Sequence, residues 1–295
     1  MTGEFLLEIG IEEIPAGYVN PALNSLSELL RNFLENSLIS YGSFETYATP
    51  RRLCVRLTDV DEMQLSREIE KTGPPVSQAY DSEGAPTRAA MGFAKSQGVD
   101  VNDLIIVEGP KGKQVAVRKI EEGRPTVDAL AENLPNMMEK IYFPKNMRWM
   151  DLDERFVRPI HWIVSLYKGE VVPFRFAGVN SGRMSHGHRF VAPDPFTVEN
   201  FSSLDAVLAS QGIQMCPVQR KAIIEDKINE LAHKENLKIL EDQDLLDEVT
   251  FLVESPYPIM GKFAEDFLEL PASILITCMK KHQRYFSVQD LNGRI

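Results

Sequence analysis

The stretch FLLEIGIEEIPAGYVNPALNSLSELLRNFLENSL, residues 5–38, contains the two patterns that decide the fold class. Its first part, Phe5 to Ile9, is a short apolar run of the kind that forms a buried strand. A proline and a glycine then interrupt the pattern, and Asn20-Pro21 supplies a polar cap followed by proline, as at the start of a helix. Leucine and phenylalanine recur at helical spacing from there until Gly42. A strand followed by an amphipathic helix is therefore expected.

The same two patterns recur along the rest of the chain without a strict strand-helix-strand rhythm. Strands are expected at residues 53–57, 114–120, 161–167, 171–176 and 285–288, with 161–176 forming a hairpin. Helices are expected at residues 86–97, 125–142 (interrupted at Pro135), 217–233, 242–254 and 271–280. We therefore predict an α+β protein with mixed sheets, packed helices and two lobes. The predicted domains are residues 1–142 and 143–295, the second with a basic window at 143–189 and a helical region at 217–280.

The composition is that of a folded globular protein. The 295 residues include 32 basic and 43 acidic side chains, a net charge of −11, and 43% are hydrophobic. The stretch that comes nearest to a membrane-spanning segment, Ile160 to Tyr167, is far shorter than the roughly 20 apolar residues needed to cross a bilayer. Glutamates occupy the amino terminus where a signal peptide needs positive charge. Three widely separated cysteines do not suggest a disulfide framework. We therefore expect a cytoplasmic protein without a membrane partner.

Basic residues concentrate in the window 143–189. It holds eight basic and four acidic side chains, so its net charge is +4 while the rest of the chain carries −15. A basic region in an acidic protein favours local docking of a polyanion. The alternative is a set of surface ion pairs. The candidate nucleic-acid-binding residues in this window are Lys145, Arg148, Arg155, Arg158, His186, His188 and Arg189.

Two segments of the window have patterns of their own. FPKNMRW, residues 143–149, interleaves cations with aromatic rings, which is typical of contacts to unpaired RNA bases. For Phe143 and Trp149 themselves we favour the alternative that they anchor the loop in the core. In SHGHRF, an extended backbone would place His186 and His188 on one face. Zinc would need further ligands, and none lies nearby in sequence, so phosphate or base contacts or an ordinary strand edge are expected instead of a metal site.

Two further basic motifs complete the candidate set. In TPRRL, Arg51 and Arg52 would point to opposite faces if a strand began there, so that one could face a ligand. In KKHQRYF, Lys280, Lys281 and Arg284 lie at the end of an expected helix. The negative end of that helix explains these three cations equally well without any partner.

Motifs of known catalytic sites are missing from the sequence. It contains no GxxxxGK[ST] or GxGxxG phosphate loop, no HExxH, no CxxC and no GxSxG. Neither cysteine nor serine has an obvious base close in sequence. We therefore predict no catalytic residue in this chain.

Eight segments, in order, resemble the amino-terminal part of the bacterial glycyl-tRNA synthetase beta subunit. They are LLEIGIEEIPAGYV, ATPRRLCVRL, REIEKTGPP, AAMGFAKSQGV, FPKNMRW, RFVRPIHWIVSL, SHGHRF and LVESPYPIMGKFAEDFLELPASILITCMKKHQRYFSV. The resemblance spans essentially all 295 residues. Members of this family are much longer, so the resemblance implies an amino-terminal fragment.

The resemblance also implies a function. In this family, two beta and two alpha subunits form a tetramer, and the class II core of the alpha subunit uses ATP and Mg²⁺, so no cofactor is expected here. The beta subunit supports tRNA(Gly) binding and aminoacylation, and part of it is similar to the editing-type domain of the phenylalanyl-tRNA synthetase large subunit. Two alternatives remain: a tRNA-editing hydrolase and a structural scaffold for alpha-subunit assembly. Glycine is the smallest amino acid, so steric exclusion of larger ones argues against a need for editing.

Overall fold

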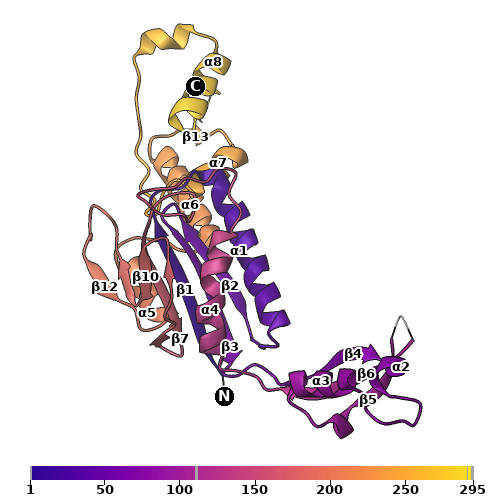
Figure 1. Ribbon diagram of the computed structural model, residues 1–295. Helices are drawn as coiled ribbons and strands as arrows, with labels where there is room; N and C mark the ends of the chain where they lie inside the picture. The colour runs from indigo at the N-terminus through magenta and orange to yellow at the C-terminus, as the bar shows by residue number, and fades with distance from the viewer. Residues whose placement is uncertain (1, 110–111, 291, 294–295) are drawn as a thin grey trace. The chain divides into compact units, whose positions relative to one another are not determined.

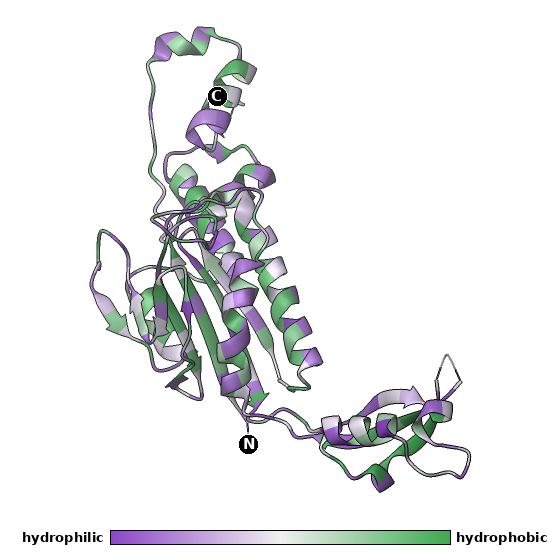
Figure 2. Cartoon of the chain, viewed as in Figure 1, coloured by the Kyte–Doolittle hydropathy of each residue, from purple (hydrophilic) through white to green (hydrophobic). Residues whose placement is uncertain are grey.

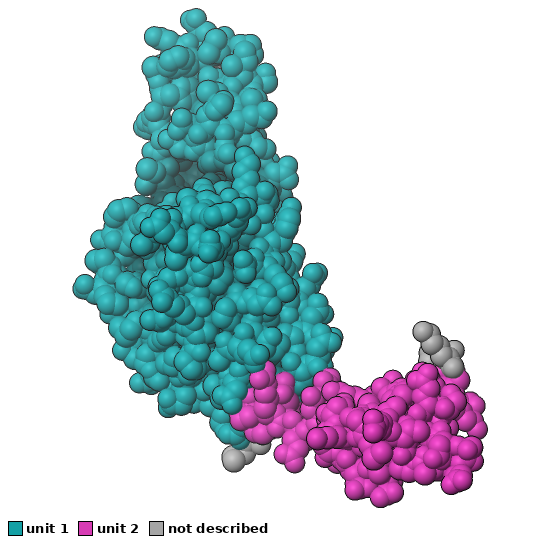
Figure 3. All heavy atoms as spheres, in the orientation of Figure 1, with its two compact units in different colours: residues 1–62, 126–295 teal, residues 63–125 magenta. Residues whose placement is uncertain are grey.

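The chain divides into two compact units in the computed structural model, which describes residues 2–109, 112–290 and 292–293 (Figure 3). Unit 1 comprises residues 1–62 and 126–295, and unit 2 comprises residues 63–125. This division differs from the expected boundary between residues 142 and 143. The physical reason is strand pairing, because β1 (Thr2–Ile11) pairs antiparallel with β7 (Ile160–Tyr167) and so joins both sides of that boundary in one sheet.

Unit 1 is built on a seven-stranded mixed sheet with the order β2-β3-β1-β7-β10-β9, to which β8 adds by pairing with β7. The pairing of β10 with β7 is parallel, and the others are antiparallel. The remaining strands of this sheet are β2 (Phe44–Thr49), β3 (Arg52–Asp61), β8 (Glu170–Val171), β9 (Arg175–Phe176) and β10 (Val179–Gly182). The strand expected at residues 5–9 is thus confirmed and occupies the centre of the sheet.

Helices pack against both faces of the sheet, so the central strand is buried on both sides, with one face apolar and the other carrying the buried Glu8 beside Leu6. Alternate residues of β1, among them Phe5 and Ile9, pack into the larger core with α1 (Ala16–Asn36) and α4 (Thr126–Glu139). Leu6 faces the opposite way, into a second core with α5 (Phe201–Ser210). Figure 1 shows α1 and α4 running along the strands, and Figure 2 shows the apolar residues concentrated on the sheet.

Helix α1 begins and ends earlier than the sequence indicates. It starts at Ala16 because Pro15, with φ of −56°, serves as its N-cap, and it then continues through Pro21. It ends at Asn36 because Leu38 adopts a left-handed φ of 53° and closes the last turn, well before Gly42. Helix α4 likewise continues through its internal proline, where an interruption was expected.

Unit 2 is a small α+β module with its own core. Its three strands form an antiparallel sheet in the order β4-β6-β5. The helix expected at residues 86–97 is confirmed as α3, which is capped by the Thr87 hydroxyl and closed by left-handed Gly98, with φ of 70°. The elements are β4 (Arg67–Pro75), α2 (Val76–Ala79), α3 (Arg88–Gln97), a 3₁₀ turn (Val101–Asp103), β5 (Ile105–Gly109) and β6 (Gly112–Glu121).

The remaining elements of unit 1 follow β10. Helix α6 confirms the helix expected at residues 217–233. The hairpin expected at 161–176 is shorter and consists of β7 and β8, because Pro173 cannot donate a hydrogen bond to the ladder. The strand expected at 285–288 is reduced, because Tyr285 still bonds to the preceding helical turn. The elements are β11 (Met184–His186), β12 (Pro195–Thr197), α6 (Pro217–Lys234), β13 (Lys238–Ile239), α7 (Gln243–Thr250), a 3₁₀ helix (Glu265–Glu269), α8 (Ala272–Cys278), a π-helical turn (Met279–Gln283) and β14 (Val288–Gln289).

Within the part of the chain that the structure describes, no helix is both long and apolar enough to cross a bilayer.

Candidate functional site: a buried polar network and an anchored basic loop

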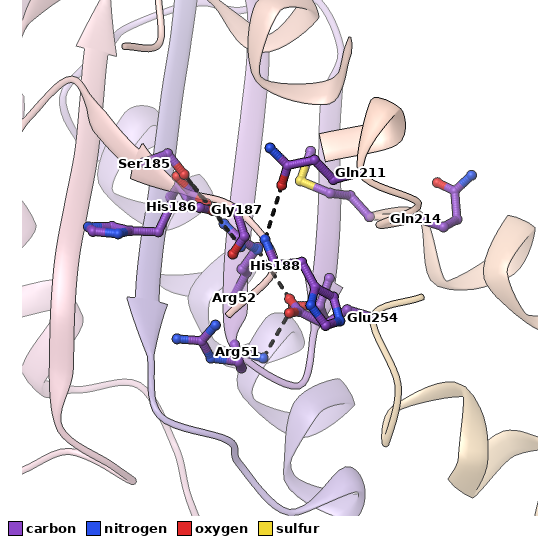
Figure 4. Close-up of polar contacts among 12 residues, drawn as sticks. Arg51, Arg52, Ser185, His186, Gly187, His188, Gln211, Gln214 and Glu254 are labelled. Atoms are coloured by element: carbon purple, nitrogen blue, oxygen red, sulfur yellow. Dashed lines mark hydrogen bonds and ion pairs between the residues drawn. The ribbon is translucent and has the colours of Figure 1, made fainter. Parts of the chain in front are cut away.

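Arg52, the first residue of β3, lies at the centre of a buried polar network (Figure 4). Its Nη1 donates to Glu8 Oε1 at 2.7 Å and to Ser185 Oγ at 3.3 Å, and its Nε donates to Glu254 Oε1 at 3.2 Å. Glu8 is completely buried, and Glu254 nearly so. Two carboxylates thus face one guanidinium, and the network joins four segments that are far apart in sequence.

The same guanidinium also holds the SHGHRF segment by its backbone. Arg52 Nη2 donates to the carbonyl oxygens of His186 at 2.7 Å and Gly187 at 3.3 Å, which brings all five donors of the side chain into use. Gly187 is required there, because a Cβ atom would come within 2.1 Å of Gln211 Oε1. The amide of His188 donates to that same oxygen at 3.0 Å. Backbone groups of His186, Gly187 and His188 therefore fix the middle of this segment.

Trp162, on β7, forms one wall of the network. The ring of His186 lies 4.8 Å from it, and the guanidinium carbons of Arg52 and Arg51 lie 5.1 and 5.7 Å from its centre. These distances are in the range of cation–π attraction. Gly10 of β1 makes room for this ring, since a Cβ atom there would lie 1.9 Å from it. Both arginines of TPRRL thus lie near one ring, although the sequence predicted opposite faces, because Arg51 precedes the strand and its alternation.

Arg51 is buried beside the network, where burial lowers the pKa of its guanidinium. Its Nε and Nη1 find no hydrogen-bond acceptor among the described residues. Glu254 is held further by the hydroxyl of Thr49 at 2.6 Å. With Arg52 fully enclosed and Arg51 only 8% exposed, neither arginine presents its charge to solvent. Both arginines therefore lie inside the protein, at the end of the central sheet, where Arg52 links the segments of the network.

Arg189 is neutralised at the surface by two glutamates of the amino-terminal motif. It contacts Glu12 through Nη2 and Glu13 through Nη1, the latter at 3.3 Å. His161 Nε2 lies 2.9 Å from the other oxygen of Glu12. Burial alone would raise the pKa of Glu12, but the hydrogen bonds from Arg189 and His161 hold that pKa below its ordinary value. The hydrogen bond to Glu12 raises the pKa of Arg189 in turn.

The basic segment FPKNMRW belongs to a loop, residues 143–158, which we call the anchored loop. Its neck is closed by two backbone hydrogen bonds between Met147 and Phe156, of 2.8 and 3.2 Å. The buried rings of Phe143 and Phe156 meet edge to face, 4.9 Å apart. Trp149 is half-buried against the same core. The aromatic residues thus anchor the loop, as the sequence analysis favoured.

The anchored loop presents cations that remain unpaired. Lys145, Arg148 and Arg155 are exposed, and Arg158 is half-buried with Nη1 donating to the carbonyl of Val157 at 3.0 Å. Among the described residues, no carboxylate lies within ion-pair distance of these four cations. Of the lysine and arginine candidates in the window, these four therefore remain free to meet a polyanion, whereas Arg189 is paired.

The cations near residue 280 have a different environment. Lys280 forms an ion pair with Asp242, and Arg284 forms one with Glu248 at 2.8 Å, so both connect to α7. Lys281 is exposed in the π-helical turn. Ion pairing thus explains two of these three residues within the chain itself.

Sequence reasoning missed the acidic half of the network and one further buried arginine. Arg220 of α6 donates from Nε to the carbonyl of Thr250 at 2.7 Å, and burial lowers its pKa to about 10. Glu8 and Glu254 were not among the candidates. A carboxylate inside the apolar run FLLEIG was the one local signal, because an isolated buried charge requires a partner. Within the described residues, no three His, Cys, Asp or Glu side chains group as metal ligands would.

The fold and these sites define a two-unit α+β protein in which a buried network braces the central sheet and a separate loop exposes cations. Comparison with known proteins then identifies the family. The family model described as "Glycyl-tRNA synthetase beta subunit" matches residues 5–295, and the chain belongs to this family.

Curated relatives agree over the whole chain. It is 46% identical over 295 residues to the glycine–tRNA ligase beta subunit of Syntrophotalea carbinolica, and 43% identical to that of Syntrophus aciditrophicus. It is 44% identical to the same subunit of Geobacter sulfurreducens. Each match covers 100% of this chain and 43% of the relative. The chain therefore spans less than half the length of the curated relatives it matches.

Proposed function

We propose that this chain is part of the beta subunit of glycine–tRNA ligase and supports tRNA(Gly) binding and aminoacylation in the cytoplasm. The observation that carries the proposal is the family match over residues 5–295, together with 46% identity to a curated beta subunit. In this proposal the chain is not catalytic alone. The alpha subunit uses ATP and Mg²⁺, and two alpha and two beta subunits assemble.

The anchored loop is the surface we propose for tRNA contact. Its free cations, Lys145, Arg148 and Arg155, are exposed on a backbone that buried aromatic rings hold in place. Cations that have no partner within the protein can neutralise phosphates without first breaking an ion pair. In a chain of net charge −11, they would also orient an approaching polyanion toward this loop. By contrast, Arg52 and Arg189 would first have to leave their glutamates.

The test is tRNA(Gly) binding by the double variant Arg148→Glu and Arg155→Glu, measured at several salt concentrations. Each phosphate contact contributes about 1 to the slope of log affinity against log salt, so the variant should bind more weakly and with a slope smaller by about 2. Arg148 and Arg155 make no ion pair that the exchange would break, so the fold should be retained, as circular dichroism would show.

The matched control is Lys234→Glu, at an exposed cation of α6 that pairs only with Glu230 on the same helix. It should leave the slope unchanged. Wild-type binding by the double variant at every salt concentration would refute tRNA contact by this loop. If the chain captured the alpha subunit but bound no tRNA at low salt, the scaffold alternative would replace tRNA binding in this proposal.

We also propose that part of the α+β fold is similar to the editing-type domain of the phenylalanyl-tRNA synthetase large subunit. Mixed sheets with packed helices support this likeness only at the level of fold class. Superposition of unit 1 on that domain, with matching strand order β2-β3-β1-β7-β10-β9, is the test. A different strand order there would contradict it.

A further inference from the structure

Residues 255–290 follow the buried network but contribute almost nothing to a core. Pro256 is the one buried residue among them, and none of the three apolar cores extends beyond Phe251. Helix α8 and the 3₁₀ helix Glu265–Glu269 both lack buried residues. This part of unit 1 therefore has secondary structure without the apolar burial that normally stabilises it.

The side chains left uncovered there are large and apolar. Residues 257–285, which we call the apolar segment, hold eight of the 22 large exposed apolar residues among the described residues, in about a tenth of the chain. Single exposed apolar residues are ordinary, but a concentration of them marks an interaction surface. The eight are Tyr257, Ile259, Phe263, Phe267, Leu268, Leu270, Ile274 and Tyr285, which are 41–83% exposed.

The charge of this region points to an apolar partner and not to a polyanion. Residues 255–290 contain four basic and four acidic side chains, so they are neutral within a chain of net charge −11. Two of the four cations, Lys280 and Arg284, are already paired with acidic residues outside the region. Electrostatic attraction therefore gives no reason for nucleic acid to cover this surface.

The apolar segment is fixed at one end and open along the rest. The ion pairs of Lys280 with Asp242 and of Arg284 with Glu248, and the pairing of β14 with β13, connect its end to α7 and β13. Beside these ties lies a cavity of about 220 Å³ with a mixed lining: apolar Leu240, Leu245, Ile276 and Tyr285, and polar Glu241, Asp242, Lys280 and Ser287. Its apolar part can receive a side chain of a partner.

We propose that the apolar segment packs against the further portion of the beta subunit that the curated relatives carry. Those subunits are more than twice as long as the part that this chain matches, because the match covers 43% of each. A surface on the same polypeptide is held at high effective concentration, so it would cover these side chains before another molecule could. This inference depends on family membership and not on the proposed tRNA contact of the anchored loop.

Hydrogen exchange with mass spectrometry tests this on the full-length beta subunit of Syntrophotalea carbinolica, without alpha, and on that subunit shortened to the 295 aligned residues. Amides aligned with α8 should exchange about tenfold or more slowly in the full-length subunit, because a covered helix opens less often. Amides aligned with α3 of unit 2, which has its own core, serve as the internal control and should not change.

Three outcomes would overturn the proposal. The first is equal exchange at α8 in both proteins. The second is protection that develops only when the alpha subunit is added, which would make alpha the partner. The third is protection in the shortened protein that rises with its concentration, which would indicate a second copy of the chain.

An apolar fluorescent dye such as ANS provides an independent measurement on this chain. The variant Ile259→Ser with Phe267→Ser should bind less than half as much dye at an unchanged unfolding temperature, because both side chains are exposed and belong to no core. Phe190→Ser is the matched control, since that ring is 83% exposed elsewhere in unit 1 and should affect dye binding little. Unchanged dye binding by the double variant would mean that the segment is not the open apolar surface.

Discussion

Arg52 shows how one buried charge depends on its partners. Its five donors are all accepted, and two of the acceptors are the carboxylates of Glu8 and Glu254. Burial of three charged groups costs desolvation energy, which their mutual attraction and hydrogen bonds offset only while the set is complete. The network therefore makes the end of the central sheet sensitive to the loss of any one member.

Replacing Arg52 by methionine should lower the free energy of unfolding of unit 1 by about 3–5 kcal/mol, because Glu8 would remain buried without a counter-charge. Urea unfolding followed by circular dichroism measures this. Lys234→Ala, which removes an exposed ion pair within α6, should cost only about 0.3–0.5 kcal/mol. A loss below about 1 kcal/mol for Arg52→Met would show that the network does not depend on this charge.

At the scale of elements, the SHGHRF segment, which begins within β11, is held from two directions. Arg52 binds its backbone carbonyls from inside, and Glu12 and Glu13 bind Arg189 from outside. The inner contacts are shielded from solvent, whereas Arg189 and Glu12 are each about a third exposed and so subject to screening. Only the outer attachment should therefore respond to mild changes in pH or salt.

The pKa of Glu12 gives this attachment a pH dependence of known sign. Because the folded-state pKa lies below the ordinary value of 4.5, ionised Glu12 stabilises the folded chain above pH 4.5, and this contribution is lost as the pH falls through the lowered pKa. Wild type should thus exceed Glu12→Gln in unfolding free energy by up to about 1 kcal/mol at pH 6, with no difference at strongly acidic pH.

Urea unfolding of both proteins between pH 6 and strongly acidic pH measures this difference. Glu28→Gln, at an exposed residue of α1, should match wild type throughout. A Glu12→Gln difference that does not vary with pH would contradict the assignment of the effect to ionisation.

At the scale of the whole molecule, unit 2 is inserted between two segments that remain adjacent in unit 1. The amide of Thr126 donates to the carbonyl of Glu62 at 2.9 Å, and its hydroxyl donates to the carbonyl of Asp61 at 2.6 Å. The ends of the insertion therefore meet, while the core of unit 2 is made of its own residues. A module of this kind can be removed without breaking the sheet of unit 1.

Replacing residues 63–125 by a short glycine-serine link should leave unit 1 folded, with an unfolding temperature within a few degrees of the intact chain, because closing so short a gap costs little entropy. Thermal unfolding by circular dichroism measures the shift. A shortened chain with exposed apolar surface and no cooperative transition would show that the sheet of unit 1 requires unit 2.

Sequence patterns predicted those helices and strands whose formation depends mainly on neighbouring residues. Phe5 to Ile9 forms a strand, and α3 ends at Gly98 because the left-handed turn favours glycine. Prediction failed where distant contacts intervene: the domain boundary near residue 143 was not observed, because β7 pairs with β1 across it. Such contacts have no signature within a short window of sequence.

The amino-acid sequence by itself determined the α+β class, most element positions and, through collinear motifs, the family. Tertiary structure alone decided which cations are free. Arg52 and Arg148 look equivalent in sequence, yet Arg52 meets Glu254, 202 residues away, while Arg148 meets no carboxylate among the described residues. The physical reason is that the charge a side chain presents depends on burial and on partners that only folding brings within a few ångströms.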